Sequence, residues 1–206
     1  MNARKPSGPP KRRASSAAVR SELLVFVEGL RTEEAYVIDW YRQYRDNVLV
    51  KVDDFRGGPL QLVEHAVEAK RSANAEAKRG RGRAYDEYWC VFDFDEHPGI
   101  PEALTLATQH GIEVALSNPC LELWFILHFE DQTANIHRHA AQKRSEELLK
   151  CTKVLSPDAL SSLREKHEAA MARAQKLDKW HEDNGSPQGE NPSASVWRLI
   201  EVIRAA

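Results

Sequence analysis

The sequence predicts an α/β protein with a mostly parallel four-stranded sheet flanked by helices, followed by a helical C-terminal extension. Four short apolar segments, rich in β-branched and aromatic residues, alternate with longer segments of helical periodicity. Continuous apolar character is typical of strands buried on both faces of a parallel sheet. Acidic residues directly follow the first and third of these segments. Parallel strands end at a common edge of the sheet, where sites form in open α/β folds.

Composition and charge divide the chain into three parts. Of its 206 residues, 42% are hydrophobic, and the net charge is −2. Residues 1–20 carry six basic side chains and no acid, so the remainder has 23 basic against 31 acidic residues. We expect a disordered basic tail over 1–20, an α/β core over 21–129, and a helical cap with a terminal helix over 130–206. The acidic remainder argues against a broad basic surface that coats nucleic acid. The tail is expected to be solvated, with nucleic-acid contact as the alternative.

The chain has no features of a membrane or secreted protein. No apolar run approaches the roughly 20 residues of a membrane span, and the N-terminus has no apolar signal segment. Three cysteines, Cys90, Cys120 and Cys151, lack metal-ligand spacing. We therefore expect a cytoplasmic protein with reduced thiols and no membrane association.

The first predicted strand, residues 23–27, ends at Glu28 and Gly29. Glycine permits a tight turn and close approach of a ligand to the backbone. Thr32 is a suitable N-cap for the helix that follows. Glu33 and Glu34 then occupy the first helical turn, where carboxylates stabilise the helix dipole, and we interpret both as structural.

The second predicted strand, residues 48–52, leads into a turn that contains Arg56 and the pair Gly57-Gly58. A glycine pair can surround a phosphate, but before a proline it is more often a simple connection. An amphipathic helix is predicted from residue 60 to about residue 75.

The third predicted strand, residues 88–92, is followed by Asp93 and Asp95. Side chains two residues apart on an extended chain point the same way, so both carboxylates can face one cation. Divalent metal chemistry is expected here. The alternative is a strand that ends in a solvated acidic turn.

The fourth predicted strand, residues 112–116, precedes an apolar helix over 120–129. Glu122 lies in the first turn of this helix. The sequence supports two roles for it equally, one in the site and one in compensating the helix dipole. His128, almost two turns further on, is interpreted as a core or surface residue. Residues 130–185 are polar and helical by pattern, with helices expected over 140–150 and 157–180. A final amphipathic helix is expected from Val196.

Several motifs together resemble known families. Glutamate after the first strand and Asp-x-Asp after the third resemble the Toprim domain of topoisomerases, primases and OLD-type nucleases. The chain also contains VEGxxTE at 27–33, WCVFDxDEH at 89–97, SNPCxELW at 117–124 with HF at 128–129, and NPSxSV at 191–196. Together these motifs resemble the RloB-like family of prokaryotic abortive-infection and defence loci, which commonly accompanies an ATPase. That resemblance covers roughly residues 23–129 and the terminal helix.

The Toprim resemblance implies that Glu28, Asp93 and Asp95 bind Mg²⁺ or Mn²⁺, with Glu28 acting as a ligand or as general base. Hard cations take oxygen ligands and keep several waters, so a few carboxylates and a substrate phosphate suffice. Arg31 or Arg56 would then stabilise the leaving oxyanion.

The implied activity is antiviral: metal-dependent cleavage of DNA or RNA, together with an AAA- or ABC-type ATPase encoded nearby. A Toprim-shaped binding or regulatory subunit is the alternative, and a homo-oligomer is left open. Haloacid-dehalogenase chemistry is disfavoured, because its Asp-x-Asp normally follows the first strand and continues to Thr.

Overall fold

The computed structural model describes residues 20–29, 31–94, 99–187 and 189–206. Its centre is a five-stranded sheet in the order β2-β1-β3-β4-β5. β1 (Ser21–Val27), β2 (Val48–Val52), β3 (Glu87–Asp93) and β4 (Glu113–Asn118) are parallel, and β5 (Ser193–Ala194) runs antiparallel to β4. The predicted α/β class is confirmed, and the predicted strand count is too low by one. β5 has only two residues, which is too short to produce a periodic pattern.

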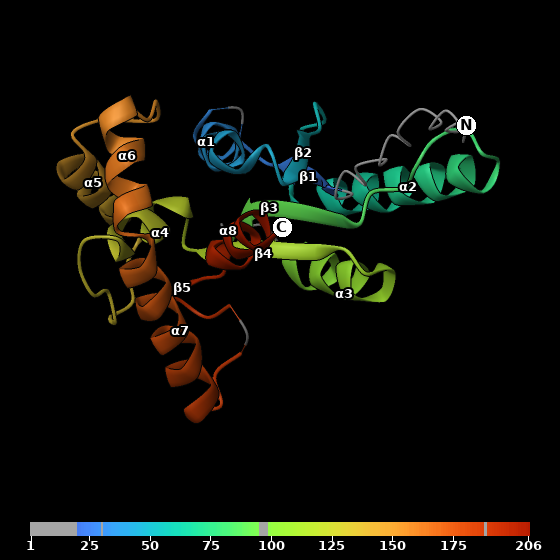
Figure 1. Ribbon diagram of the computed structural model, residues 1–206. Coiled ribbons are helices and arrows are strands. Elements are labelled where there is room, and N and C mark those ends of the chain that lie inside the picture. Colours follow the sequence, from blue (N-terminus) through green and yellow to red (C-terminus); the bar gives the residue numbers. More distant parts are fainter. Residues whose placement is uncertain (1–19, 30, 95–98, 188) are drawn as a thin grey trace, which may run out of the picture.

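Helices connect the strands and continue as an extension toward the C-terminus (Figure 1). They are α1 (Thr32–Tyr44), α2 (Pro59–Lys78), α3 (Ile100–His110), α4 (Leu121–Leu127), α5 (Arg138–Leu149), α6 (Pro157–Glu165), α7 (His167–Asp183) and α8 (Val196–Ala205). The single helix predicted over 157–180 is in fact two helices, α6 and α7. They meet at Lys166, whose backbone leaves the helical region at φ −101° and ψ 6°, and neither Gly nor Pro marks this break in the sequence.

Alternate residues of the central strands enter two separate cores. On one face, Leu24 and Phe26 of β1 pack against α2 and α3. On the other face, Leu23, Val25 and Val27 pack in the core that includes α1, α8 and the extension. All five side chains are buried, which explains why the segment is apolar without alternation.

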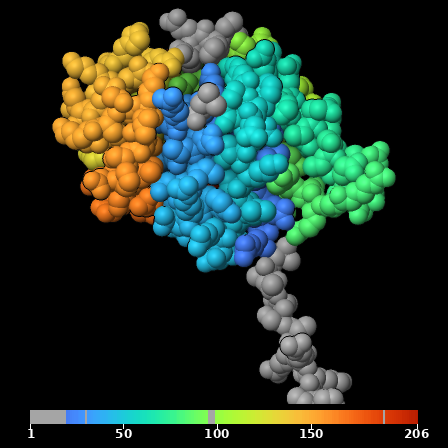
Figure 2. Space-filling view, turned by 90° about the horizontal axis from the view of Figure 1, so that it is seen from above, coloured from blue at the N-terminus to red at the C-terminus, as the bar shows by residue number. Residues whose placement is uncertain are grey.

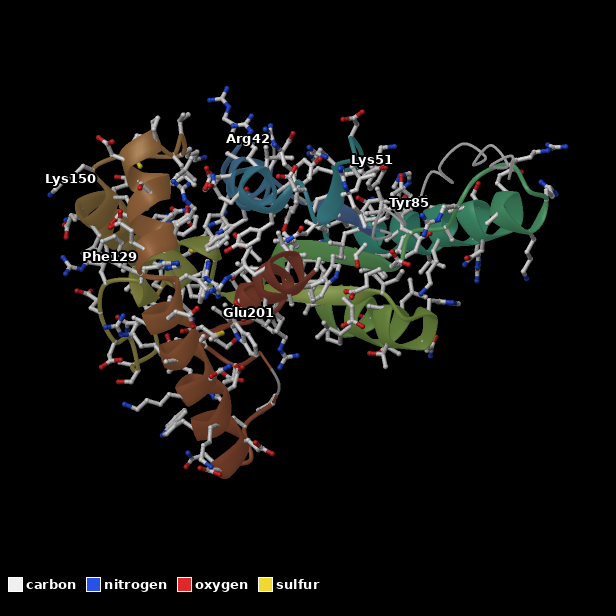
Figure 3. All side chains as sticks on the ribbon, in the orientation of Figure 1. Arg42, Lys51, Tyr85, Phe129, Lys150 and Glu201 are labelled. Atoms are coloured by element: carbon white, nitrogen blue, oxygen red, sulfur yellow. The ribbon has the colours of Figure 1, made fainter. Side chains whose placement is uncertain are left out.

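The extension, α4 to α7, is held against α1. The indole N–H of Trp124 on α4 donates to the Tyr36 hydroxyl of α1 at 2.8 Å, and Arg164 of α6 pairs with Asp39 of α1. Figure 2 shows the surface of this extension directly beside that of α1. In Figure 3, Glu201 projects from α8, where its carboxylate lies 3.0 Å from His167 Nε2 of α7. The extension is thus tied to the sheet layer by several polar contacts.

Within the described ranges, no helix is both long enough and apolar enough to cross a bilayer. Cys90 and Cys120 are buried free thiols, and Cys151 is a partly buried free thiol.

Candidate active site

Parallel pairing of β1 with β3 brings the two predicted strand-end acids together. Val27 pairs with Val91, and the next backbone N–H, that of Glu28, donates to the Val91 carbonyl at 3.1 Å. The Asp93 N–H in turn donates to the Glu28 carboxylate at 3.3 Å. The structure therefore places the Glu28 carboxylate against the Asp93 backbone at the carboxyl edge of the sheet, and both residues line the same cavity.

Four carboxylates surround one cavity of about 400 Å³ at this edge. We call it the acid cavity. Its acidic residues are Glu28 after β1, Glu33 on α1, Asp93 at the end of β3 and Glu122 on α4. Glu122 thus lies where a role in the site requires it. Asp95 falls outside the described residues, so its part in the site stays a prediction.

Glu33, interpreted from the sequence as structural, also lines the acid cavity, and its side chain folds back over Gly29. A Cβ atom added to Gly29 would lie 2.1 Å from Glu33 Oε2 and 2.5 Å from its carboxyl carbon. The carboxylate thus occupies the space that a Cβ atom at residue 29 would fill, and a larger residue there would displace it. The sequence signal was present as a glycine four residues before an acid in a first helical turn, but the dipole explanation accounted for Glu33 equally well.

The cluster of acids makes negative charge unfavourable in the cavity. Loss of hydration raises the pKa of Asp93 well above its usual range, and the charges of Glu33, Glu122 and Glu28 raise it further. One contact opposes this rise: the Leu121 N–H, at the start of α4, donates to Asp93 Oδ1 at 2.8 Å.

Glu33 shows the same pattern. Loss of hydration raises its pKa most, a hydrogen bond to its own backbone N–H lowers it, and Glu122 and Glu28 raise it. The nearby charge of Arg138 lowers it only weakly. The repulsion between these acids is the part of both shifts that a bound cation would relieve.

Three basic residues, Arg31, Arg138 and Lys153, also line the acid cavity. Arg31, predicted from the sequence, precedes α1. Arg138 at the start of α5 and Lys153 after that helix were not predicted, because they lie in a segment without a recognisable motif. Thr32 was predicted as the N-cap of α1, but it is the first helical residue, and its hydroxyl donates to the Lys153 carbonyl at 2.9 Å. A contact between distant segments thus replaces the local cap.

Arg56, the other candidate for stabilising an oxyanion, lies outside the residues that line the acid cavity. Its guanidinium pairs with Glu34 at 2.7 Å and donates to the Phe55 carbonyl at 2.8 Å. The pair with Glu34 links the turn after β2 to α1, and the bond to Phe55 is local to the turn. Both contacts support structural roles for Arg56 and Glu34.

The Cys120 thiol and the His128 imidazole, which lie at the two ends of α4, are unsuited to chemistry in the cavity. Burial, followed by the charges of Glu122 and Asp93, raises the pKa of the Cys120 thiol, which disfavours a nucleophilic thiolate. His128 is buried, and its Nδ1 lies 2.8 Å from the Trp124 carbonyl. Burial lowers the pKa of His128 to about 3, so the ring is neutral.

The donor set has the chemistry of a site for a hard cation. All four acidic groups offer carboxylate oxygens, the ligands that Mg²⁺ and Mn²⁺ prefer. A divalent ion would also relieve the repulsion that raises the pKa of Asp93 and Glu33. Among the residues that the structure describes, no three His, Cys, Asp or Glu side chains are already arranged as a ligand set. The residues fit such an ion in chemistry and charge, with Glu28 and Asp93 as the adjacent pair.

Comparison with known proteins identifies the family. No curated protein sequence matches the chain. A family model described as RloB-like protein matches residues 23–203, a range that contains every residue lining the acid cavity. The chain therefore belongs to the RloB-like protein family.

Proposed function

We propose that the protein is a Toprim-type nuclease that cleaves phosphodiester bonds in DNA or RNA with Mg²⁺ or Mn²⁺. One observation carries the proposal: four carboxylates from the sheet edge and two helices converge on a single cavity that three basic residues also line. Acids suit a divalent ion, and bases suit the phosphate that the ion would share.

The acids have distinct tasks in this proposal. Glu28 and Asp93 hold the ion together with Asp95, and the Leu121 N–H fixes the direction of the Asp93 carboxylate. The bound ion would supply charge stabilisation on the phosphate and lower the pKa of an attacking water. Glu28 is the candidate to accept the proton of that water, and its position beside Asp93 supports this role. Glu33 and Glu122 complete the negative field that retains the ion.

The basic residues serve the substrate. The water oxygen forms a bond to phosphorus as the bond from phosphorus to one ester oxygen breaks, and negative charge develops on the departing oxygen. Arg31 is assigned to that oxygen, while Arg138 and Lys153 neutralise the phosphate oxygens that remain.

A second candidate is a Toprim-shaped binding or regulatory subunit without catalysis. The observation in its favour is that no three potential ligands among the described side chains are already set around one point. In that case the acids would hold an ion for structure, or none.

Family membership motivates the partner and the biological role. We place the protein in phage defence or abortive infection, acting with an AAA- or ABC-type ATPase. The charge of the chain supports dependence on a partner, because residues after the basic tail have 23 basic against 31 acidic side chains and offer limited affinity for phosphates. The isolated chain should accordingly show low activity, which the ATPase raises.

The decisive experiment incubates the full chain with panels of DNA and RNA in Mg²⁺ or Mn²⁺, with and without the ATPase. Cleavage that disappears in Asp93→Asn supports the nuclease proposal. Brisk cleavage by the chain alone, unaffected by the ATPase, would overturn the regulatory part only. No cleavage under any condition would favour the binding subunit.

A further inference from the structure

A second hollow adjoins the acid cavity on the side of the extension. It has a volume of about 760 Å³ and lies between the residue after β3, the turn from β4 to α4, and the start of α5. We call it the side groove. Arg138, Gln142 and Lys153 line both hollows, so a ligand in the side groove is next to the acids.

The charge of the side groove is opposite in character to that of the acid cavity. None of the described residues that line it is Asp or Glu, although the chain contains 31 acidic residues. Its lining instead includes Arg138, Lys153 and the imidazoles of His137 and His139. The first turn of α5 has no acid, so basic groups stand at the positive end of the helix dipole, where an anion would offset them. The lining is complementary to a polyanion.

Flat rings border the same groove. Phe94 is half-buried, and its ring packs beside Gly189, where an added Cβ would lie 3.8 Å from Phe94 Cδ2. His137 and His139 are exposed, with ring centroids 5.2 Å apart. Basic groups interleaved with rings on which bases stack are typical of proteins that bind single strands. In a duplex the bases are paired and stacked inside the helix, so they cannot stack on protein side chains.

Some lining amides serve the fold and not a ligand. The Asn118 side chain donates to the Gly189 carbonyl at 2.7 Å. The Asn191 side chain accepts from the Ile136 N–H at 3.0 Å and donates to the Ile136 carbonyl at 2.9 Å. These bonds fix the floor of the side groove, and recognition of a ligand is assigned to the basic side chains, the rings and Gln142.

We infer that the side groove binds one strand of nucleic acid and directs it past the acid cavity. The inference rests on the proposed function and names its substrate class: an unpaired strand or a single-stranded region of a folded nucleic acid. Arg138 and Lys153 contact phosphates at the junction of the two hollows. Phe94 and His139 contact bases or backbone in the groove alone, since neither lines the acid cavity.

Binding to uncleavable complexes tests the inference. The full chain carrying Asp93→Asn is titrated, without divalent metal, against fluorescent single-stranded DNA and RNA oligonucleotides and their duplexes, and anisotropy is measured at several salt concentrations. Phe94→Ala should weaken binding of single strands about tenfold, while Phe94→Tyr retains it. Arg138→Gln and Lys153→Gln should each reduce the salt slope of log K by about 0.7. Lys143→Gln, an exposed lysine on α5 that lines neither hollow, is the matched control and should bind like the parent.

The inference is overturned if Phe94→Ala and His139→Gln bind like the parent, if Lys143→Gln weakens binding as much as Lys153→Gln, or if duplexes bind as tightly as their strands. Thermal melts of each variant identify loss of fold, and His139→Gln keeps the test valid if Phe94→Ala unfolds. Groove-dependent binding with no cleavage by the native chain, either alone or with the ATPase, would support the inference and refute the nuclease proposal. Cleavage by the native chain with a KM that the groove variants leave unchanged would support the nuclease proposal and refute the inference about the side groove.

Discussion

Replacing Asp93 separates its structural contact from its electrostatic cost. In the parent, the Leu121 N–H donates to Asp93 Oδ1 at 2.8 Å. In Asp93→Asn, Oδ1 can still accept this bond, but the acceptor changes from charged to neutral and the bond weakens by about 1 kcal/mol. Removing one of four clustered charges is favourable by a similar amount. We therefore expect the free energy of unfolding without metal to stay within about 1 kcal/mol of the parent. Asp93→Ala leaves the Leu121 N–H unpaired and should cost about 1–3 kcal/mol.

Added Mg²⁺ then distinguishes the variants. At ten times its dissociation constant, an ion that binds only the folded state stabilises it by about 1.4 kcal/mol. For a chain of this size, that raises Tm by about 3–6 °C. The parent should show this rise, and Asp93→Asn should lose most of it. Asp46→Asn, an exposed carboxylate between α1 and β2, is the matched control and should keep the full rise.

Melts followed by circular dichroism across a MgCl₂ titration give the stability without metal and the Mg²⁺-dependent rise in Tm from one set of samples. The reasoning is refuted if Asp93→Asn shows the same Mg²⁺-dependent rise as the parent. It is equally refuted if Asp93→Asn unfolds, since the carboxylate would then be required for the fold and not for an ion.

Three further predictions concern single side chains. Gly29→Ala should expel the Glu33 carboxylate and reduce the Mg²⁺-dependent rise in Tm, whereas Gly58→Ala, where an added Cβ meets nothing within 4 Å, should not. The folded pKa of His128, about 3, lies below its unfolded value of 6.5, so its contribution to stability is present above pH 6.5 and is lost as pH falls. Between pH 7.5 and pH 5 urea titrations should show a loss of about 2 kcal/mol that His128→Gln lacks; an equal loss in both would contradict the assignment. Tyr36→Phe leaves the buried indole N–H of Trp124 unpaired and should lower the free energy of unfolding by about 1–3 kcal/mol. The response to Mg²⁺ should not change. A melt identical to that of the parent would disprove the predicted loss of stability.

The half of the site at the sheet edge was predictable because it follows from strand geometry. Buried parallel strands are recognisable as apolar runs, and a carboxylate directly after such a run must lie at the carboxyl edge. That reasoning places Glu28 and Asp93, which the structure joins through a 3.3 Å hydrogen bond. Glu33 was missed because its direction depends on space above Gly29, which is a steric property of the folded turn.

The other half of the site comes from residues remote in sequence. Arg138 and Lys153 belong to a polar segment with many basic side chains, and nothing in the local pattern distinguishes these two from the rest. The break between α6 and α7 and the two-residue β5 were missed for a related reason. Both are set by packing of the extension on the core, and local propensity is a weak guide where tertiary contacts decide.

One helix organises both halves. The first residue of α1, Thr32, bonds the carbonyl of Lys153, and the next, Glu33, carries a carboxylate into the acid cavity. Further along the same helix, Tyr36 holds α4 and Asp39 holds α6. The sheet edge and the extension are thus both positioned against α1. The extension forms part of the cavity wall, to which it contributes Glu122, Arg138 and Lys153. Under the proposed function, its two basic residues would offset the repulsion between the acids and an approaching phosphate.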